Sequence, residues 1–297
     1  MIGNELLSER AVTRRFHVVD AVMTEHGARM DATGDRWLLE QTIATGSERR
    51  NLLRRIPLVE GSAVLDVGVG FGALAFDVAA LYPVRVVGVD QNPEMIDHAT
   101  VLCEQIRSAD GFIPGSTLSF QLGDAQKLPF PDGSFDMVMA RFVFQHLSEP
   151  IVAAKEIARV LKVGGVACLV DVDEALSLSY PEESSAFTLL YSAFRALQME
   201  NGGDRQVGRK LAHYLAEFGE LEVIGTFVDH QAHHGRLSDL SMQLTVARFE
   251  QVRSDVIERD LLDAERYDHA LEAFRREGQA ARFQSVGQVT VFAQKKL

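Results

Sequence analysis

The sequence predicts an α/β fold built on a mostly parallel sheet. Short β-branched runs alternate with helical stretches over residues 61–172, and a glycine-rich loop follows the first run. Helical periodicity occupies the residues before and after this part. Strands that alternate with helices form βαβ units, whose parallel sheets are covered by helices on both faces.

The individual elements follow from the pattern in chain order. Residues 1–56 place apolar side chains three and four apart, which predicts helices with breaks at Gly27 and Gly34. Five strands are expected next, at residues 63–67, 84–89, 118–122, 135–140 and 166–172. The helices between them are expected at 72–81, 93–107 and 148–161, the last with Ser148 as its cap. Further helices are expected at 181–199, 209–218 and 238–277, and further strands at 220–228 and 286–293.

Composition excludes several classes of protein. The 297 residues are 46% hydrophobic and 24% charged, which is ordinary for a globular protein and rules out disordered, collagen-like and disulfide-scaffold chains. The formal net charge is −12, and all of the acidic excess lies in residues 61–250. Nucleic-acid binding through a basic face is therefore not expected.

The cysteines and apolar runs bear on location. Cys103 and Cys168 each lie in an apolar run and are interpreted as buried thiols in a reducing compartment. The first residues lack the apolar core of a signal peptide, and no apolar run approaches the ~20 residues that span a bilayer. We expect a soluble, cytoplasmic protein that does not bind membranes.

The most informative segment is VLDVGVGFGA, residues 64–73. A strand leads directly into Gly68, Gly70 and Gly72, and a helix follows. Glycines at such a turn let the backbone approach a ligand whose polar groups meet the helix N-terminus. Asp90 ends the next strand, at the distance where a carboxylate accepts both hydroxyls of a ribose. The pattern predicts a cofactor that contains adenosine.

Two cofactor classes fit the loop, because GVGFGA also matches dinucleotide-binding enzymes. Asp66, two residues before Gly68, would repel a pyrophosphate but attract a ligand that carries an ammonium group. Asp124, just after the third strand, could accept an adenine amino group. The fourth strand ends in RFVFQH, residues 141–146, at the sheet edge where open α/β sites form.

Together these segments resemble the class I S-adenosylmethionine-dependent methyltransferases, in particular the small-molecule branch of the ubiquinone/menaquinone biosynthesis methyltransferases. The resemblance is carried by VLDVGVGFG, VVGVDQNPEMI, GDAQKLPFPDGSFDMV and EIARVLKVGG, and covers residues 60–175. It implies a Rossmann-like, seven-stranded, mostly parallel sheet in the order 3-2-1-4-5-7-6, with the seventh strand antiparallel.

The resemblance also implies a division of the chain. Residues 1–58 would form a helical N-terminal cap and residues 59–175 the S-adenosylmethionine-binding core. Residues 176–297 would add helical substrate or lid insertions and the last two strands, within one structural domain. The long connection before the last strand, residues 231–285, would form a lid or an oligomer surface, because simpler relatives have a hairpin there.

The family's cofactor contacts transfer to matching positions. Asp66 would support the methionine amino group, Gly68 and Gly70 would border the methionine part, and Asp90 would hold the ribose. The remaining expected cofactor-binding residues lie near the adenine or the methionine end: Gln91, Asn92, Met95, Asp124, Ala125 and Arg141.

Methyl transfer from a sulfonium needs donor and acceptor held in line, and a side-chain base only if the acceptor arrives protonated. His146 follows the fourth strand and has an ordinary pKa that suits a base. Asp171, Asp173 and Glu174 follow the fifth strand, where alternation places the two aspartates on one side. These four are the catalytic candidates. Helix capping by His146 and solvation of the three acids are the alternatives.

Three other groups are given ordinary structural roles. Solvated loop residues are expected at His230, His233 and His234, so no metal is predicted although histidine clusters can hold one. Helical core packing is expected for Tyr180, Phe187, Tyr191 and Phe194, although inserts at this place often line the acceptor pocket in the family. Solvated faces are expected for Arg14, Arg15, Arg49, Arg50, Arg54 and Arg55.

The resulting expectation is an S-adenosylmethionine-dependent methyltransferase. It would move a methyl group to O, N or C of a small metabolite, with a role in secondary metabolism and S-adenosylhomocysteine as product. Two alternatives stay open: a protein of this fold that binds S-adenosylmethionine but performs a cyclisation or rearrangement, and an NAD-dependent oxidoreductase. The expected partner is a small-molecule acceptor, without nucleic acid or membrane, and a homo-oligomer is left open.

Overall fold

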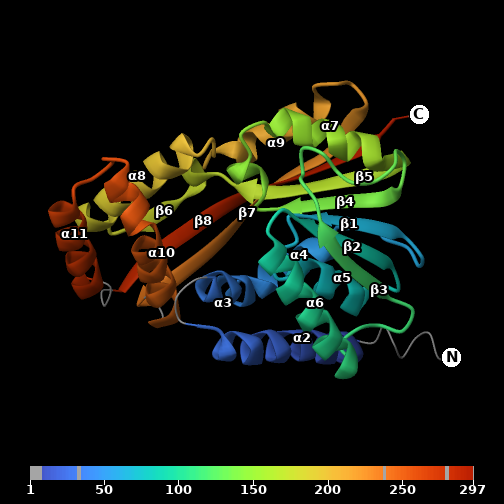
Figure 1. The fold of residues 1–297 in the computed structure, drawn as a ribbon, viewed down its shortest axis with the longest axis horizontal. Helices are drawn as coiled ribbons and strands as arrows, with labels where there is room; N and C mark the ends of the chain where they lie inside the picture. The colour runs from blue at the N-terminus through green and yellow to red at the C-terminus, as the bar shows by residue number, and fades with distance from the viewer. Residues whose placement is uncertain (1–8, 32–34, 237–238, 278–280, 297) are drawn as a thin grey trace.

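The computed structural model describes residues 9–31, 35–236, 239–277 and 281–296 (Figure 1). In this part of the chain eight strands form one sheet, in the order β3-β2-β1-β4-β5-β8-β6, with β7 paired to the free side of β8. The strands are β1 (Ala63–Val67), β2 (Arg85–Asp90), β3 (Thr117–Leu122), β4 (Phe135–Arg141), β5 (Leu161–Val172), β6 (Leu178–Tyr180), β7 (Leu221–Arg236) and β8 (Ala281–Lys295).

The topology confirms the predicted sheet order. Strands β1 to β5 pair in parallel, and β8 is antiparallel to β5 and to β7. With β7 and β8 as the predicted sixth and seventh strands, the order is 3-2-1-4-5-7-6. The short strand β6 is an addition that the sequence pattern did not predict, because three residues are too few to show alternation.

Helices flank the sheet and form the ends of the molecule. The N-terminal helices are α2 (Glu9–Arg29), α3 (Arg36–Ala44) and α4 (Gly46–Leu53), and the crossover helices are α5 (Ala73–Leu81), α6 (Pro93–Ser108) and α7 (Pro150–Val160). Later come α8 (Ser185–Glu200), α9 (Leu211–Ala216), α10 (Asp239–Glu258) and α11 (Ala264–Glu277). Short 3₁₀ turns are η1 (Phe144–His146), η2 (Glu174–Leu176) and η3 (Val207–Lys210).

Four local predictions need correction. Gly27 does not break a helix, because α2 continues through it to Arg29, and the break expected at Gly34 lies outside the described residues. Ser148 does not cap α7: Glu149 is the N-cap residue without a side-chain bond, and Pro150 begins the helix with its backbone angle already suited. The stretch 238–277 is two helices, separated near Asp260, whose φ is 59°. Strand β7 continues to Arg236, so the connection to β8 is shorter than 231–285. Its polar end, DHQAHHGR, lacks the apolar alternation that would have predicted a strand.

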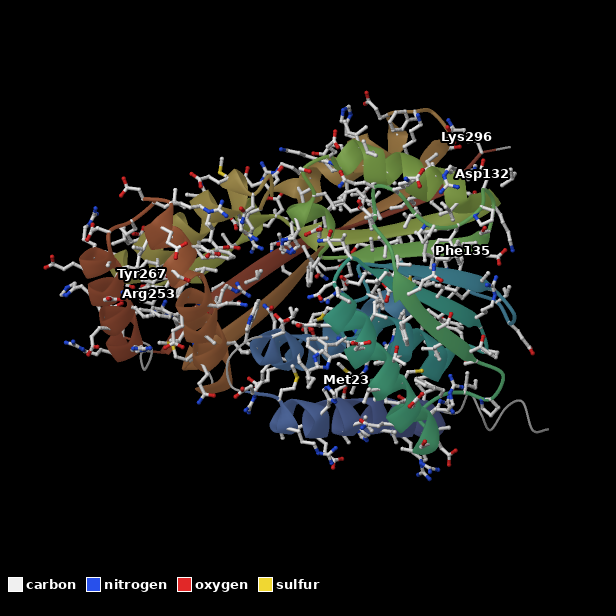
Figure 2. The ribbon with its side chains drawn as sticks, in the orientation of Figure 1. Met23, Asp132, Phe135, Arg253, Tyr267 and Lys296 are labelled. Atoms are coloured by element: carbon white, nitrogen blue, oxygen red, sulfur yellow. The ribbon has the colours of Figure 1, made fainter. Side chains whose placement is uncertain are left out.

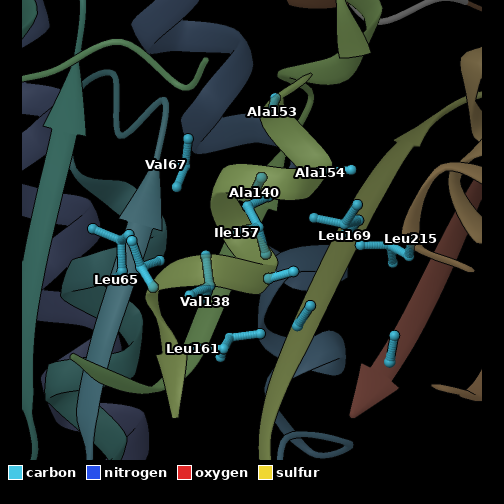
Figure 3. Packing of buried hydrophobic residues seen from close by; sticks show 14 of the residues in the cluster. Leu65, Val67, Val138, Ala140, Ala153, Ala154, Ile157, Leu161, Leu169 and Leu215 are labelled. Carbon is cyan, nitrogen blue, oxygen red and sulfur yellow. The ribbon is translucent and has the colours of Figure 1, made fainter. Parts of the chain in front are cut away.

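The main core lies between the sheet and the helices on one of its faces. Figure 3 shows Leu65 and Val138 of neighbouring strands close to Ile157 of α7. All five residues of β1 are buried, as expected for a central parallel strand covered on both faces. The opposite face packs against α4 and α5 through a second cluster that includes Leu53.

A separate helical unit, consisting of α8, α10 and α11, has a hydrophobic core of its own. Leu190, Phe249 and Phe274 are buried there, and the hydroxyl of the buried Tyr267 donates to the carbonyl of Phe249 at 2.6 Å. In Figure 1 this unit lies at the far left, beyond the parallel strands, at the distal end of the β7–β8 pair. None of the described helices is long and apolar enough to cross a bilayer.

Candidate functional site

The glycine loop joins the carboxyl end of β1 to α5. Gly68 has a φ of +68°, and a Cβ there would lie 2.4 Å from Val143 Cγ2, so only glycine fits. Gly70 has a φ of +50°, and no atom lies within 4 Å of where its Cβ would be. The loop therefore leaves open space directly above Gly70, where a ligand can approach the backbone.

Asp66 lies beneath this loop and is 2% exposed. Its Oδ2 has no hydrogen-bond partner among the described residues. Burial raises the pKa of Asp66 to about 7, against the lowering effect of the Ala75 backbone N–H. A buried carboxylate oxygen without a donor costs free energy, and a ligand ammonium group would satisfy it.

Asp90 ends β2 beside the same loop. Its Oδ2 accepts from the Gly70 N–H at 2.9 Å, and its Oδ1 accepts from the Asn92 N–H at 3.0 Å. Each carboxylate oxygen can accept a second hydrogen bond, so these two bonds orient Asp90 and leave it able to accept from a ligand. Asp90, the predicted ribose-binding residue, is thus hydrogen-bonded to the glycine loop.

The expected adenine neighbours lie on the following turns. Asn92 caps α6 by accepting from the Glu94 N–H at 2.9 Å, and Met95 is buried in the first turn of that helix. Asp124 is exposed, and its Oδ1 accepts from the Gln126 N–H at 2.8 Å. Gln91 is exposed next to Asn92, and Ala125 is half-buried next to Asp124.

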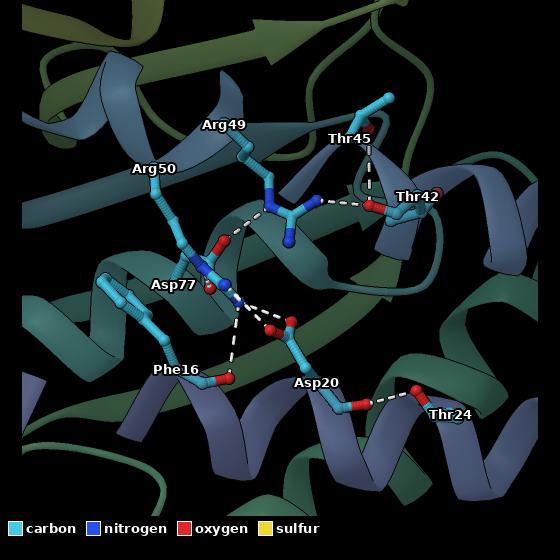
Figure 4. Close-up of polar contacts among 8 residues, drawn as sticks. All are labelled: Phe16, Asp20, Thr24, Thr42, Thr45, Arg49, Arg50 and Asp77. Atoms are coloured by element: carbon cyan, nitrogen blue, oxygen red, sulfur yellow. Dashed lines mark hydrogen bonds and ion pairs between the residues drawn. The ribbon is translucent and has the colours of Figure 1, made fainter. Parts of the chain in front are cut away.

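Figure 4 shows a buried ion-pair network that corrects the prediction of a solvated face for Arg49 and Arg50. Three of the other arginines are exposed as predicted: Arg14, Arg54 and Arg55. Arg49 of α4 is 1% exposed, and its Nε donates to Asp77 Oδ2 at 2.6 Å. Arg50 joins the same Asp77 to Asp20 of α2. Arg15 is also buried and donates to the Ala80 carbonyl at 2.5 Å. The network joins three helices, α2, α4 and α5, and helical periodicity alone does not reveal which helices lie side by side.

Arg49 also bears on the ligand site. Its Nη2 is buried without a hydrogen-bond partner in the described chain. Its charge acts on both Asp66 and Arg141, which places it near the end of the glycine loop. A buried guanidinium nitrogen of this kind can bind a ligand carboxylate. Sequence reasoning missed this residue because it assigned Arg49 to a solvated face.

The end of β4 turns sharply toward the site. Phe142 has a φ of 60°, an uncommon value for a residue with a side chain and one that often marks functional sites. The Arg141 guanidinium carbon lies 4.0 Å from the Phe142 ring centroid. Burial, then the positive charge of Arg49, lowers the pKa of Arg141 to about 9. Arg141 is therefore still protonated at neutral pH.

The catalytic candidate His146 lies in η1, directly after this turn, and is exposed. Protein nevertheless surrounds the ring on several sides, and this desolvation, followed by the charge of Arg205, lowers the pKa of His146. The imidazole is thus neutral at pH 7, the form in which it can accept a proton.

The three acids after β5 have different surroundings, and both aspartates are buried rather than solvated. Asp171 accepts from the backbone N–H groups of Gln145 and Val172, and burial raises its pKa to about 7. Both oxygens of Asp173 are held by Arg209 at 2.6 Å, which favours a structural role over the catalytic one.

Glu174 belongs to a cluster that sequence reasoning did not assemble. Its Oε1 accepts from Arg205 Nε at 2.5 Å and from the Tyr191 hydroxyl at 2.7 Å. Arg205 also donates to Gln145 Oε1, the neighbour of His146. We call these four residues, Gln145, Glu174, Tyr191 and Arg205, the Arg205 cluster. It joins the end of β4 to α8, through residues that no local motif connects.

The remaining predicted residues have mixed outcomes. His230 Nδ1 lies 3.1 Å from Ser285 Oγ, and His234 is exposed, whereas the His233 side chain lies outside the described atoms. Within the described residues no group of three potential ligands could hold a metal ion. Phe194 packs in the helical unit as expected, but Tyr180 is 76% exposed, so core packing was wrong for it.

Comparison with known proteins identifies the central segment. A family described as a methyltransferase domain matches residues 65–169. Residues 65–169 form a class I methyltransferase domain. An uncharacterized methyltransferase of Schizosaccharomyces pombe is 34% identical over 163 residues, which cover 52% of this chain and 57% of that protein. The ubiquinone/menaquinone biosynthesis C-methyltransferase of Geotalea uraniireducens is 30% identical over 159 residues, or 50% of this chain and 65% of that one.

Solved structures agree on the fold of the methyltransferase domain. A crystal structure of a Bacillus halodurans protein described as a methyltransferase has a TM-score of 0.56 at 20% identity, covering 84% of this chain and all of that chain. Among the first curated relatives, the matched segment spans between 33% and 65% of each relative's own length. The family match covers residues 65–169, and the matches to these five relatives cover between 38% and 65% of this chain.

Proposed function

We propose that this protein transfers the methyl group of S-adenosylmethionine to a small-molecule acceptor. The observation that carries the proposal is the unpartnered, buried Oδ2 of Asp66, two residues before a glycine loop that leaves open space at Gly70. A dinucleotide pyrophosphate would be repelled there, whereas the ammonium group of a methionine moiety supplies the missing donor. The match to a methyltransferase domain supports the same cofactor.

The residues of this chain have separate tasks in the proposed reaction. Asp66 and Arg49 would hold the ammonium and carboxylate groups of the methionine moiety, and Asp90 the ribose hydroxyls. Gln91, Asn92, Met95, Asp124 and Ala125 would surround the adenine, and the Arg141 backbone would border the methionine end. When bound, S-adenosylmethionine supplies an electrophilic methyl group on a sulfonium sulfur.

Proton removal would fall to residues near the ends of β4 and β5. His146 is neutral at pH 7 and follows the turn at Phe142, so it can take a proton from an acceptor hydroxyl or amine. Asp171 is fixed by two backbone N–H groups and orients η1. Glu174, held by Arg205 and Tyr191, would contact the acceptor or position the groups that do. The acceptor atom stays open between O, N and C.

Isothermal titration with S-adenosylhomocysteine tests the cofactor assignment. Replacing Asp90 by Ala removes the ribose contacts and the bond that orients Gly70, so we expect at least ~30-fold weaker binding, the effect of losing about two hydrogen bonds. Asp97→Ala, at an exposed acid on helix α6, which follows Asp90 in the chain, is the matched control and should bind normally. Equal binding by both variants would refute the ribose assignment.

Product analysis distinguishes the other two classes. Methyl transfer yields one S-adenosylhomocysteine per product, whereas a cyclisation or rearrangement yields product without it. Thermal protection by NADH and none by S-adenosylhomocysteine would favour an oxidoreductase. We also propose that the protein acts in secondary metabolism and is located in the cytoplasm. The helices before β8 would form a lid over the acceptor.

A further inference from the structure

Arg248 of α10 has no anionic partner among the residues that the structure describes. Its guanidinium carbon lies 5.4 Å from the ring centroid of Trp37 on α3 and 5.7 Å from that of Phe194 on α8. None of the ion pairs and hydrogen bonds between described residues involves its guanidinium, although other arginines of α10 and α11 are paired. Burial, then the charge of Arg205, lowers the pKa of Arg248. A partly buried cation between aromatic rings, without a carboxylate, is a place where an anion would be stabilised.

Arg205 also lies close to the Phe194 ring. Its guanidinium carbon is 5.8 Å from that ring centroid, so Arg205 and Arg248 both flank one phenylalanine. Arg205 is already paired with Glu174 and Gln145, whereas Arg248 is not. Only one of these two neighbouring guanidinium groups is paired with a carboxylate, which leaves a surplus positive charge in an otherwise acidic protein.

The indole of Trp37 supplies an independent observation. Its Nε1 is shielded from solvent and has no hydrogen-bond acceptor in the described part of the chain. An indole N–H that is buried without an acceptor costs free energy, so an oxygen atom near it would stabilise the folded protein. Trp37 stacks against Arg248, and one anionic group can therefore satisfy both side chains.

The nearby acids do not remove this positive surplus. Asp173 is paired through both oxygens with Arg209, and Glu174 is shared between Arg205 and, at 3.9 Å, Arg195. Asp171 is buried and held by backbone N–H groups at the end of β5. Glu174 Oε2 is buried without a hydrogen-bond partner in the described chain, but the charge of this carboxylate is offset by Arg205 and, at 3.9 Å, by Arg195. Among the described residues Arg248 has no such carboxylate, so an anionic acceptor would find an unpaired guanidinium.

We propose that the acceptor carries a carboxylate or phosphate group, which Arg248 binds together with Arg205 and the Trp37 N–H. This inference rests on the proposed function, since it names the substrate class of the same site. Guanidinium groups bind both kinds of oxyanion through paired N–H donors. The anionic group would lie toward the helical unit and leave the opposite end of the acceptor for the methyl group.

Trp37 is the single tryptophan of the chain, so its fluorescence reports on this place alone. We would titrate the protein, saturated with S-adenosylhomocysteine, with benzoate and with phenyl phosphate at constant ionic strength. Benzamide, which has the shape of benzoate without its charge, is the neutral control. We expect a saturable fluorescence change with at least one anion, and at least ~10-fold weaker binding of benzamide. The better anion identifies the source as carboxylate or phosphate.

Arg248→Met tests the residue itself, because methionine keeps an apolar chain against Trp37 and Phe194 without the charge. It should weaken binding of the preferred anion at least ~10-fold. Arg253→Met is the matched control: Arg253 lies on the same helix, is paired with Asp268 and is labelled near Tyr267 in Figure 2. That variant should bind the anion normally. Circular dichroism verifies that both variants are folded.

The outcomes separate the two proposals. If the protein binds S-adenosylhomocysteine but neither anion, or binds benzamide as well as benzoate, the anionic acceptor is refuted and the methyltransferase proposal stands. If S-adenosylhomocysteine does not bind but an anion does, with loss in Arg248→Met, the anion site stands and the cofactor assignment fails. Comparison of benzoate with benzamide uses only the unaltered protein, so it decides the question even if Arg248→Met does not fold.

Discussion

Two parts of the candidate site differ in charge and in construction. The cofactor half, consisting of Asp66, the glycine loop, Asp90 and Asp124, uses carboxylates and glycines on consecutive strand ends. The acceptor half, consisting of the Arg205 cluster, Arg248 and Trp37, uses guanidinium groups and aromatic rings from distant segments. Under the two proposals above, one acidic chain would provide separate places for a cationic and an anionic molecule, because local charge is set by side-chain placement and not by composition.

The largest expected effect concerns the packing that supports the cofactor half. Arg49→Met leaves Asp77, which is fully buried, without its closest cation, and breaking a buried pair costs about 3–5 kcal/mol of unfolding free energy. Urea denaturation measures the loss. Arg29→Met removes an exposed pair with Glu25 and should cost under ~1 kcal/mol. Similar losses in the two variants would contradict the importance of the buried network.

Gly70→Ala addresses the cofactor half directly. Both Gly70 and Gly61 have positive φ, and neither has an atom within 4 Å of where the alanine methyl group would lie, so alanine should cost each site a similar ~1–2 kcal/mol of stability. Only Gly70 borders the expected cofactor. In Gly70→Ala the added methyl group would occupy the ligand space, so the affinity for S-adenosylhomocysteine, measured by calorimetry, should fall ~30-fold or more. In Gly61→Ala the affinity should stay unchanged. Equal affinities would show that the space above Gly70 is not the ligand site.

The pH dependence of binding separates the halves further. Burial raises the pKa of Asp66 to about 7 in the free protein, and an ammonium ligand prefers the ionised carboxylate. Affinity for S-adenosylhomocysteine should therefore rise between pH 6 and pH 8, by at most ~10-fold per unit. Asp66→Asn should bind weakly and without this slope. Benzoate, held by arginines that stay protonated over this range, should show no rise, and a parallel rise for both ligands would contradict the assignment.

The smallest expected effect lies in the acceptor half. Tyr191→Phe removes the hydroxyl that donates to Glu174 and receives Arg205 at 3.3 Å, which should cost about 1 kcal/mol of stability. Binding of the preferred anion should weaken a few-fold because Arg205 loses one restraint, while affinity for S-adenosylhomocysteine is retained. Tyr180→Phe, at a tyrosine that is 76% exposed, is the control and should change neither quantity.

The cofactor half could be predicted because its signals are local. A buried strand, a glycine turn and an acid at the end of the next strand lie within 28 residues, from Ala63 to Asp90, and each has a short-range physical reason. Local patterns also predicted the parallel strands, whereas the capping of α6 by Asn92 was not predicted. Strand β7 was predicted too short because its distal residues pair outside the parallel sheet and are polar.

The acceptor half could not be assembled from the sequence, since its residues meet only through tertiary structure. Gln145 and Arg205 are 60 positions apart, and no single motif contains both. Trp37 and Arg248 lie on the first and last thirds of the chain. Arg49 was assigned to solvent because an arginine on a short polar helix is usually exposed, and only the position of Asp77 on α5 explains its burial.

The β7–β8 ladder has a consequence for how such proteins diverge. It runs from Leu221 opposite Lys295 to Arg236 opposite Ala281, whereas β5 accompanies β8 only as far as Val172 opposite Gln288. Removing two residues from each strand beyond that point would bring α10 closer to the parallel strands by roughly 7 Å. Because side chains alternate with a period of two, each remaining side chain would stay on its face of the sheet. Insertions and deletions in this strand pair would thus change the acceptor side of the proposed site. The strand ends of β1 to β5, where the cofactor is proposed to bind, would stay the same.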